Sequence, residues 1–171
     1  MKDSNKKTAY FMAQAGMIAA IYTVLTTVFA PISFGPIQFR VSEALCILPY
    51  FTPAAVPGVF LGCLISNMVG MAMGTSVALD VIFGSLATLI GAVGSYMVRN
   101  HKWLVAVPPI VSNTVIIPWV LRYAYGAQEL IPLMMVTVGI GEILAIGVFG
   151  NLLLTALEKY KVAIFGKSFA S

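Results

Sequence analysis

Three acidic side chains lie at or inside apolar stretches of this sequence, where an ionised group is unfavourable. The chain has six acidic residues among 171, and Glu43, Asp80 and Glu142 are the three that fall in or beside long apolar runs. An ionisable group inside a membrane costs at least about 2.5 kcal/mol and is by default a candidate for a functional site. Glu142 is the hardest to explain structurally, because its neighbours in the sequence are glycines and apolar residues.

Amide and guanidinium groups near these carboxylates extend the set of candidate ligand-binding residues. A carboxylate can accept two hydrogen bonds from a ring N–H and an adjacent exocyclic amine, as a guanine-like edge offers, and amides can read the remaining groups. A second carboxylate would suit a ligand that bears a primary amine. The residues that could join the three acids in one pocket are Gln38, Arg40, Asn67 and Asn113.

Each of these residues also has a structural interpretation. Glu43 and Asp80 could be favourable anions in the first turn of a helix, with Arg40 as a surface partner of Glu43. The amides could form hydrogen bonds between helices or with water. The sequence leaves these alternatives open.

The sequence argues against enzyme chemistry and against a metal site. It contains no GxSxG, HExxH or GxxxxGK[ST] pattern, so we expect no catalytic residue and no ATP site in this chain. The one histidine, His101, lies at a predicted loop edge, and Cys46 and Cys63 lack CxxC spacing. We therefore expect no metal and no cofactor, and we interpret the cysteines as small buried apolar residues.

The composition is that of a membrane protein. Hydrophobic residues make up 60% of the chain, charged residues 9%, and the mean hydropathy is +0.95, whereas soluble domains carry about 25% charge. We expect an all-α fold forming a single integral membrane domain over residues 1–171. The first apolar run continues to Phe29 without a small-residue cleavage site, which predicts a spanning helix and not a cleavable signal peptide.

The apolar runs predict six transmembrane helices. Residues 43–74 are apolar throughout but carry Pro49, Pro53 and Pro57, which cannot all lie in one unbroken helix. We therefore predict a hairpin there, with a short second span that its neighbours must shelter. The predicted spans are 8–29, 42–52, 57–73, 80–98, 104–121 and 131–157.

The distribution of basic residues favours this topology. With six spans and both termini in the cytoplasm, eight of the ten lysines and arginines lie inside and two lie outside. A single helix in place of the hairpin would leave four inside and six outside, against the positive-inside rule. The inside set is Lys2, Lys6, Lys7, Arg99, Lys102, Lys159, Lys161 and Lys167; the outside set is Arg40 and Arg122.

This topology brings the candidate polar residues toward one outward-facing pocket. Glu43 and Asp80 begin spans from the outside, Asn67 lies in the outer half of its span, and Asn113 and Glu142 lie near the middle of theirs. Gln38 and Arg40 belong to a lid-like loop before the second span. The sequence thus predicts a pocket that is open to the outside and floored by Glu142.

The first span carries small residues at helical spacing. Ala15 and Ala19 are four residues apart, as are Gly16 and Ala20, and such faces allow another helix to approach closely in lipid. This face could dock a partner protein or pack inside the chain itself.

Four segments carry a resemblance to a known family. They are SFGPIQFRVSEAL at 33–45, GVFLGCLISN at 58–67, LDVIFGSLATLIG at 79–91 and VGIGEILAIGVFGNLL at 138–153. In this order and spacing the chain resembles the QueT family over about residues 9 to 160. These proteins are substrate-binding S-components of energy-coupling factor (ECF) transporters in the bacterial cell membrane, assigned to uptake of queuosine precursors.

The resemblance implies a ligand and partners. The ligand would be a 7-deazaguanine, namely queuine or its aminomethyl or cyano precursor, and no nucleic acid would be bound. The small-residue face of the first span, at Ala15 and Ala19, would dock on a transmembrane coupling protein. Two cytoplasmic ATPases would supply the energy while the loaded S-component topples in the bilayer.

Three other functions remain open from the sequence. The chain could be an S-component for a different vitamin. It could instead be a stand-alone secondary transporter with Glu142 as the proton carrier. An intramembrane enzyme is the third alternative, although no histidine lies within the predicted spans to act as a base.

Overall fold

The computed structural model describes residues 2–33 and 39–165, and every element in these ranges is helical. The α-helices are α1 (Lys2–Val28), α2 (Ala30–Ser33), α3 (Ala55–Ala72), α4 (Ser85–Met97), α5 (Val107–Ala124), α6 (Ile131–Glu142), α7 (Asn151–Glu158) and α8 (Lys161–Phe165). Two 3-10 helices, η1 (Val41–Tyr50) and η3 (Lys102–Leu104), and two π-helices, η2 (Asp80–Gly84) and η4 (Ile143–Gly150), complete the set. The prediction of an all-α fold is confirmed.

Five helical stretches in the described part of the chain are long and apolar enough to cross a membrane. They are Asn5–Val28, Ala55–Ala72, Asp80–Met97, Lys102–Ala124 and Ile131–Glu158. Each begins and ends within a few residues of a predicted span. The predicted second span corresponds to η1, which is apolar but has only 10 residues. Six membrane crossings therefore remain a prediction.

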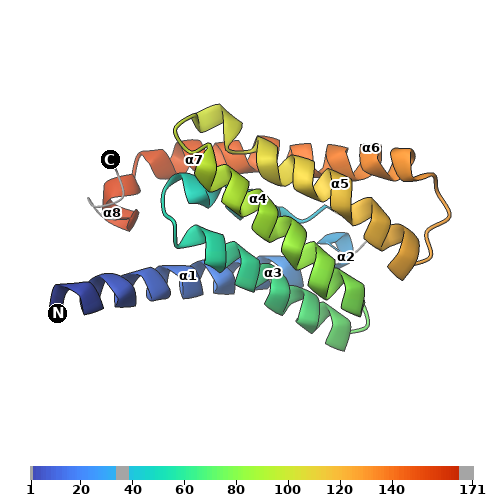
Figure 1. The fold of residues 1–171 in the computed structure, drawn as a ribbon, viewed down its shortest axis with the longest axis horizontal. Helices are drawn as coiled ribbons and strands as arrows, with labels where there is room; N and C mark the ends of the chain where they lie inside the picture. Colours follow the sequence, from blue (N-terminus) through green and yellow to red (C-terminus); the bar gives the residue numbers. More distant parts are fainter. Residues whose placement is uncertain (1, 34–38, 166–171) are drawn as a thin grey trace.

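Consecutive long helices pack side by side in the order α1, α3, α4, α5 and α6 (Figure 1). Glycines bring two of these pairs close together. A Cβ atom on Gly62 of α3 would lie 2.6 Å from Cβ of Tyr22 on α1, and one on Gly91 of α4 would lie 2.6 Å from Cα of Pro109 on α5. No larger residue fits at either contact without moving a helix, so these glycines set the spacing of the bundle.

The short helix η1 lies at the centre of the bundle. All its residues from Ser42 to Pro49 are buried, and it contacts α1, α3, α4, α7 and η4. A helix that is buried on every side needs partners all round it and not a lipid-facing surface. The expectation that neighbouring helices shelter this segment is thereby met.

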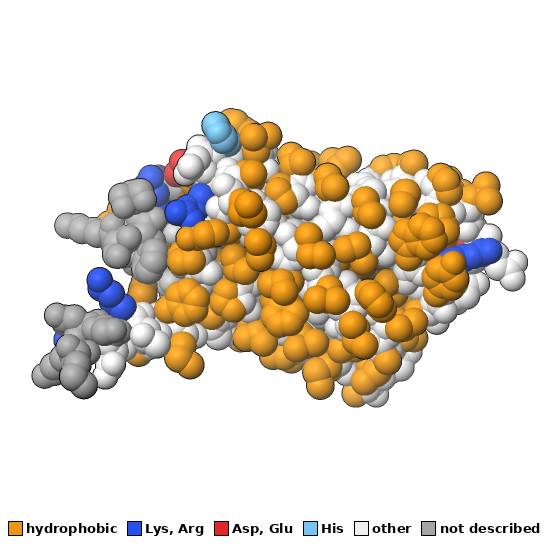
Figure 2. Space-filling view, viewed as in Figure 1, with side chains coloured by type: hydrophobic (Ala, Val, Ile, Leu, Met, Phe, Trp, Pro, Cys, Tyr) orange, Lys and Arg blue, Asp and Glu red, His pale blue; other side chains and the backbone are white. Residues whose placement is uncertain are grey.

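The surface agrees with a membrane environment. Hydrophobic side chains cover the long middle section of the visible face, and lysine and arginine side chains gather mainly at the left end, with little basic surface at the opposite end (Figure 2). α1 begins and α8 ends at the same end of the molecule (Figure 1). Both described ends lying at one end is what the prediction of an even number of membrane crossings requires.

Candidate ligand-binding site

The loop that enters η1 carries its charged residues into the interior. Arg40 is 5% exposed and Glu43 is 1% exposed. The guanidinium of Arg40 forms an ion pair with Asp80, 3.2 Å from Nη2 to Oδ2. The alternative that Arg40 and Glu43 form a surface pair is therefore wrong, because both side chains are buried and Arg40 pairs with the acid that begins η2.

Asp80 connects three separate loops through one oxygen. Its Oδ2 accepts hydrogen bonds from Arg40 before η1, from Ser76 after α3 at 3.3 Å, and from the hydroxyl of Tyr125 after α5 at 3.1 Å. Burial and, next, the negative charge of Asp80 raise the pKa of Tyr125 to about 12. The phenol therefore stays protonated and keeps donating to Asp80 across the ordinary pH range.

Glu43 is held by donors from three helices. Its Oε1 accepts from the hydroxyl of Tyr22 on α1 and from Thr88 on α4 at 3.5 Å. Its Oε2 accepts from the thiol of Cys46, one turn further along η1, at 3.0 Å. A buried carboxylate requires such donors, since an uncompensated charge in the interior is strongly unfavourable.

Cys63 of α3 joins the Asp80 and Glu43 clusters. Its sulfur accepts from Arg40 at 3.8 Å, from the amide of Asn67 at 3.5 Å and from Thr88 at 3.3 Å. Asn67 also donates to the backbone carbonyl of Asp80 at 3.1 Å. The result is one continuous buried polar network, which we call the central cluster.

The members of the central cluster come from five helices (α1, η1, α3, η2 and α4) and the loop before η1. They are Tyr22, Arg40, Glu43, Cys46, Cys63, Asn67, Asp80 and Thr88.

Glu142 lies beside this network at the end of α6. It is 6% exposed, and its Oε2 has no hydrogen-bond partner among the described residues. Asn113 of α5 and Glu43 of η1 are its polar neighbours. Two carboxylates thus face one buried region, which is the chemistry expected of a site that recognises a donor-rich ligand.

The three buried acids all lie where the helix geometry is irregular. Glu43 belongs to a 3-10 helix, Asp80 begins the π-helix η2, and Glu142 immediately precedes the π-helix η4. π-helical turns occur frequently at functional sites because they turn side chains away from the positions an α-helix would give them.

The structure brings most of the predicted site residues together. Glu43, Asp80, Asn67 and Arg40 belong to the central cluster, and Asn113 and Glu142 lie beside it. Gln38 lies outside the described residues.

Sequence reasoning missed four members of the cluster: Tyr22, Cys46, Cys63 and Thr88. No signal in the sequence singles out these four residues, since the first span carries other aromatic residues besides Tyr22. The cysteines were correctly expected to be buried, but their contacts to Glu43 and Arg40 depend on the packing of different helices.

The predicted docking face divides into two. Ala15 and Ala19 are buried, and their carbonyl oxygens would lie 3.0 Å from Cβ atoms placed on Gly58 and Gly62 of α3. Gly16 and Ala20 are exposed, and a Cβ on Gly16 would meet nothing within 4 Å. One pair therefore packs inside the chain, and the other pair is open to a neighbour.

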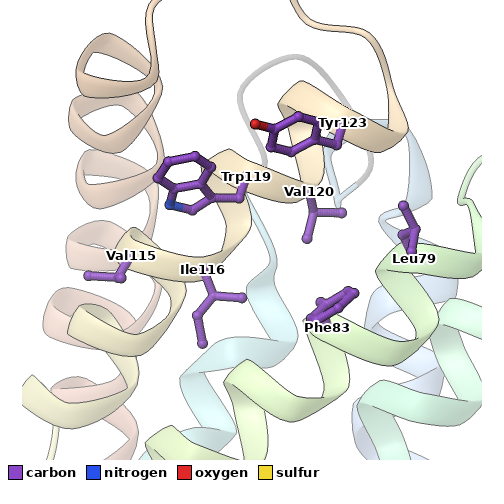
Figure 3. A pocket seen from close by; sticks show the side chains of 7 residues that line it. All are labelled: Leu79, Phe83, Val115, Ile116, Trp119, Val120 and Tyr123. Carbon is purple, nitrogen blue, oxygen red and sulfur yellow. The ribbon is translucent and has the colours of Figure 1, made fainter.

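A separate groove between the start of the fourth span and α5 differs in character. It has a volume of about 270 Å³ and is lined by Leu79, Phe83, Val115, Ile116, Trp119, Val120 and Tyr123 (Figure 3). Most of these side chains are exposed on the apolar surface, and the rings of Trp119 and Tyr123 stack. It offers a polar ligand only an indole N–H and a phenol hydroxyl, so the candidate site is the central cluster with Glu142.

The sequence profile of the family described as "QueT transporter" matches residues 12–159, which is most of the chain. The chain belongs to the QueT transporter family. This family is one of transporters and not of enzymes, and the apolar helices of this QueT protein fit a multi-pass protein of the cell membrane.

One curated relative is the "Queuosine precursor transporter QueT" of Lactococcus lactis subsp. cremoris (strain MG1363). It is 38% identical over 87 residues, which are 50% of this chain and 48% of the relative. The matched segment thus spans about half the length of that relative. No solved structure matches this QueT protein.

Proposed function

We propose that this chain binds a queuosine precursor and carries it across the membrane as the S-component of an ECF transporter. The observation that carries the proposal is the central cluster with Glu142, which places three carboxylates in the interior of a QueT family membrane protein. Buried charges of this kind are unfavourable for stability alone, and in membrane proteins they mark ligand or ion pathways. The printed name of the Lactococcus relative supports a queuosine precursor as the ligand.

A 7-deazaguanine suits the chemistry of this site. Its ring N–H and exocyclic amine form a pair of adjacent donors that one carboxylate can accept. Asn67 and Asn113 supply amide groups that can form hydrogen bonds with other polar atoms of the ring. A site built in this way rejects analogues that lack these groups, because its own polar atoms would remain unpaired.

A binding measurement tests the ligand. We expect purified protein in detergent to bind a 7-deazaguanine and to show no thermal stabilisation by riboflavin, thiamine or biotin. Mass spectrometry of any small molecule that co-purifies would identify the ligand independently. Stabilisation by one of the other vitamins, with none by a deazaguanine, would contradict the proposed substrate.

The exposed pair Gly16 and Ala20 supports docking on a coupling protein through α1. Replacing both by leucine should abolish complex formation and uptake while leaving ligand binding intact. Ala72→Leu, at an exposed position of α3, is the matched control and should preserve both. Unchanged pull-down of the coupling protein by the Gly16 and Ala20 variant would refute this docking face.

The unpartnered Oε2 of Glu142 favours one competing function, a proton-coupled transporter that needs no ATPase. Reconstituting the chain alone in proteoliposomes distinguishes this proton-coupled transporter from the proposed S-component. Uptake driven by a pH gradient would establish the competing function. Uptake only in the presence of the coupling protein, the ATPases and ATP would establish the S-component.

A further inference from the structure

Three of the candidate site residues each keep one buried oxygen that can only accept a hydrogen bond and that lacks a donor. In the described part of the chain, Asn67 Oδ1, Asp80 Oδ1 and Glu142 Oε2 have no hydrogen-bond donor. The amide orientation of Asn67 is fixed because its nitrogen donates to the Asp80 carbonyl. Leaving a buried acceptor unpaired is unfavourable, so a ligand that supplies donors gains affinity here.

The same region holds more acidic than basic side chains. Arg40 is the only buried basic side chain among the described residues, and it pairs with Asp80. Glu43 and Glu142 then remain without a basic partner in the described ranges. A charge in a low-dielectric interior is strongly unfavourable unless an opposite charge or several donors compensate it.

The two remaining acids differ in how they are compensated. Glu43 accepts hydrogen bonds from Tyr22, Thr88 and Cys46. Glu142 keeps one buried oxygen without a hydrogen-bond donor among the described residues. Glu142 is therefore the place in this site where a positive charge on the ligand would gain most.

We propose that the site selects ligands carrying a protonated amine and that Glu142 binds this amine. The inference rests on the proposed function and deepens it by naming the ligand class. Among 7-substituted 7-deazaguanines, the site takes the cationic aminomethyl forms and discriminates against the neutral cyano form. The guanine-like edge is common to both, so the substituent alone decides between them.

The experiment compares three ligands that share one ring. Their dissociation constants are measured by calorimetry on the whole protein in nanodiscs, with 7-aminomethyl-, 7-hydroxymethyl- and 7-cyano-7-deazaguanine. The hydroxymethyl compound matches the aminomethyl compound in size and lacks its charge. We expect the aminomethyl ligand to bind at least about tenfold more tightly than either neutral ligand, as a charge-assisted hydrogen bond in a buried site provides.

A Glu142 variant tests whether Glu142 causes the tighter binding of the aminomethyl ligand. Glu142→Gln should weaken the aminomethyl ligand about tenfold or more, and it should leave the two neutral ligands within about threefold. Glu129→Gln, in an exposed loop, is the matched control and should change none of the three. If Glu142→Gln does not fold, the comparison of the three ligands on the unaltered protein still decides the proposal.

The outcomes separate this inference from the proposed function. Equal affinity for the cyano and aminomethyl ligands, or equal weakening of all three by Glu142→Gln, would overturn amine selection while confirming a deazaguanine-binding protein. Failure of all three ligands to bind would overturn the proposed substrate and this inference together.

Discussion

At the level of single residues, the balance of donors around each buried acid determines what that acid can do. Glu43 accepts hydrogen bonds at both of its carboxylate oxygens, whereas Asp80 keeps Oδ1 and Glu142 keeps Oε2 without a donor among the described residues. A fully bonded carboxylate orders the interior, and a partly bonded one is available to a ligand. We therefore expect Asp80 and Glu142 to have an oxygen available to a ligand that supplies donors, and Glu43 to be engaged mainly by the protein.

Removing the hydroxyl of Tyr22 should destabilise the protein. Tyr22 is fully buried and donates to Glu43, so Tyr22→Phe leaves a buried acceptor with one donor fewer. We expect a loss of about 1–3 kcal/mol in the free energy of unfolding, measured by denaturant titration in mixed micelles.

Tyr10→Phe is the matched control for this prediction. The hydroxyl of Tyr10 donates to the Ile164 carbonyl at 3.0 Å in an exposed position. Its loss should change the unfolding free energy by no more than about 0.5 kcal/mol. Equal effects of the two substitutions would show that the Tyr22 hydrogen bond has no special role.

Tyr125 should make stability depend on alkaline pH. Its pKa is raised to about 12 by burial and by Asp80, compared with about 10 for a free tyrosine. The contribution of Tyr125 is complete below pH of about 10 and disappears as pH rises to about 12, because only the unfolded chain loses the proton in this interval. Tyr125→Phe should remove this part of the pH dependence.

An ultraviolet titration checks the assignment to Tyr125. Tyrosinate absorbance of the folded protein should show a component titrating near 12 that is absent in Tyr125→Phe. The Tyr123→Phe variant, whose ring is largely exposed, should retain that component. Loss of the component in the Tyr123 variant alone would contradict the assignment.

Much of the site could be predicted from residue types, and its pairings could not. Glu43, Asp80 and Glu142 stand out because charge is rare in apolar segments, and all three are buried. The pairing of Arg40 with Asp80 joins residues that are 40 positions apart. The sequence alone favours the nearby Glu43 as a partner, since helix packing across the bundle is not visible in it.

At the level of elements, irregular helices and close-packed glycines shape the site. The 3-10 helix η1 and the π-helices η2 and η4 hold or adjoin the three acids. The apolar periodicity predicts where helices lie, because each must bury or expose a face. It does not distinguish an α-helix from a 3-10 or π-helix, since the same residue types form all three.

A larger residue at Gly62 should disturb the site through helix spacing. A Cβ at this position lies 2.6 Å from Cβ of Tyr22, so Gly62→Leu must push α1 away from α3 and move Tyr22 relative to Glu43. We expect a loss of about 1–3 kcal/mol in the free energy of unfolding, measured in mixed micelles, together with weaker ligand binding.

Gly16→Leu provides the comparison on the same bundle. Nothing lies within 4 Å of a Cβ at Gly16, so the side chain extends away from the protein and the helix is not displaced. Its unfolding free energy should be unchanged or slightly higher, because glycine is unfavourable inside a helix. Comparable destabilisation by both substitutions would argue against the close α1–α3 contact as the cause.

At the level of the whole molecule, the arrangement of charge supports an oriented membrane protein. α1 begins and α8 ends at one end (Figure 1), and the basic side chains of the visible surface gather mainly at that same end (Figure 2). The five long apolar helices lie between this end and the opposite end. The long helices could be predicted from hydropathy, and so could the need for neighbours to shelter the short segment at η1. Which helices surround η1 could not be predicted, since packing across the bundle is not visible in the sequence.

Cysteine labelling in intact cells tests the orientation. Cys46 and Cys63 are buried, so the unaltered protein should react little with an impermeant maleimide. Gln128→Cys, in an exposed loop after α5, should react from the outside. His101→Cys, exposed between α4 and α5, should react only after the membrane is permeabilised. The reverse pattern would invert the proposed orientation.

The shortness of η1 also bears on how the chain is made. Its 10 residues extend about 20 Å as a 3-10 helix, well short of the roughly 30 Å of a bilayer core. It cannot hold a position in lipid alone, and one of its neighbours, η4, is synthesised near the end of the chain. We therefore expect η1 to take its place only when synthesis is almost complete, and a chain truncated after Gly126 should leave Cys46 open to maleimide.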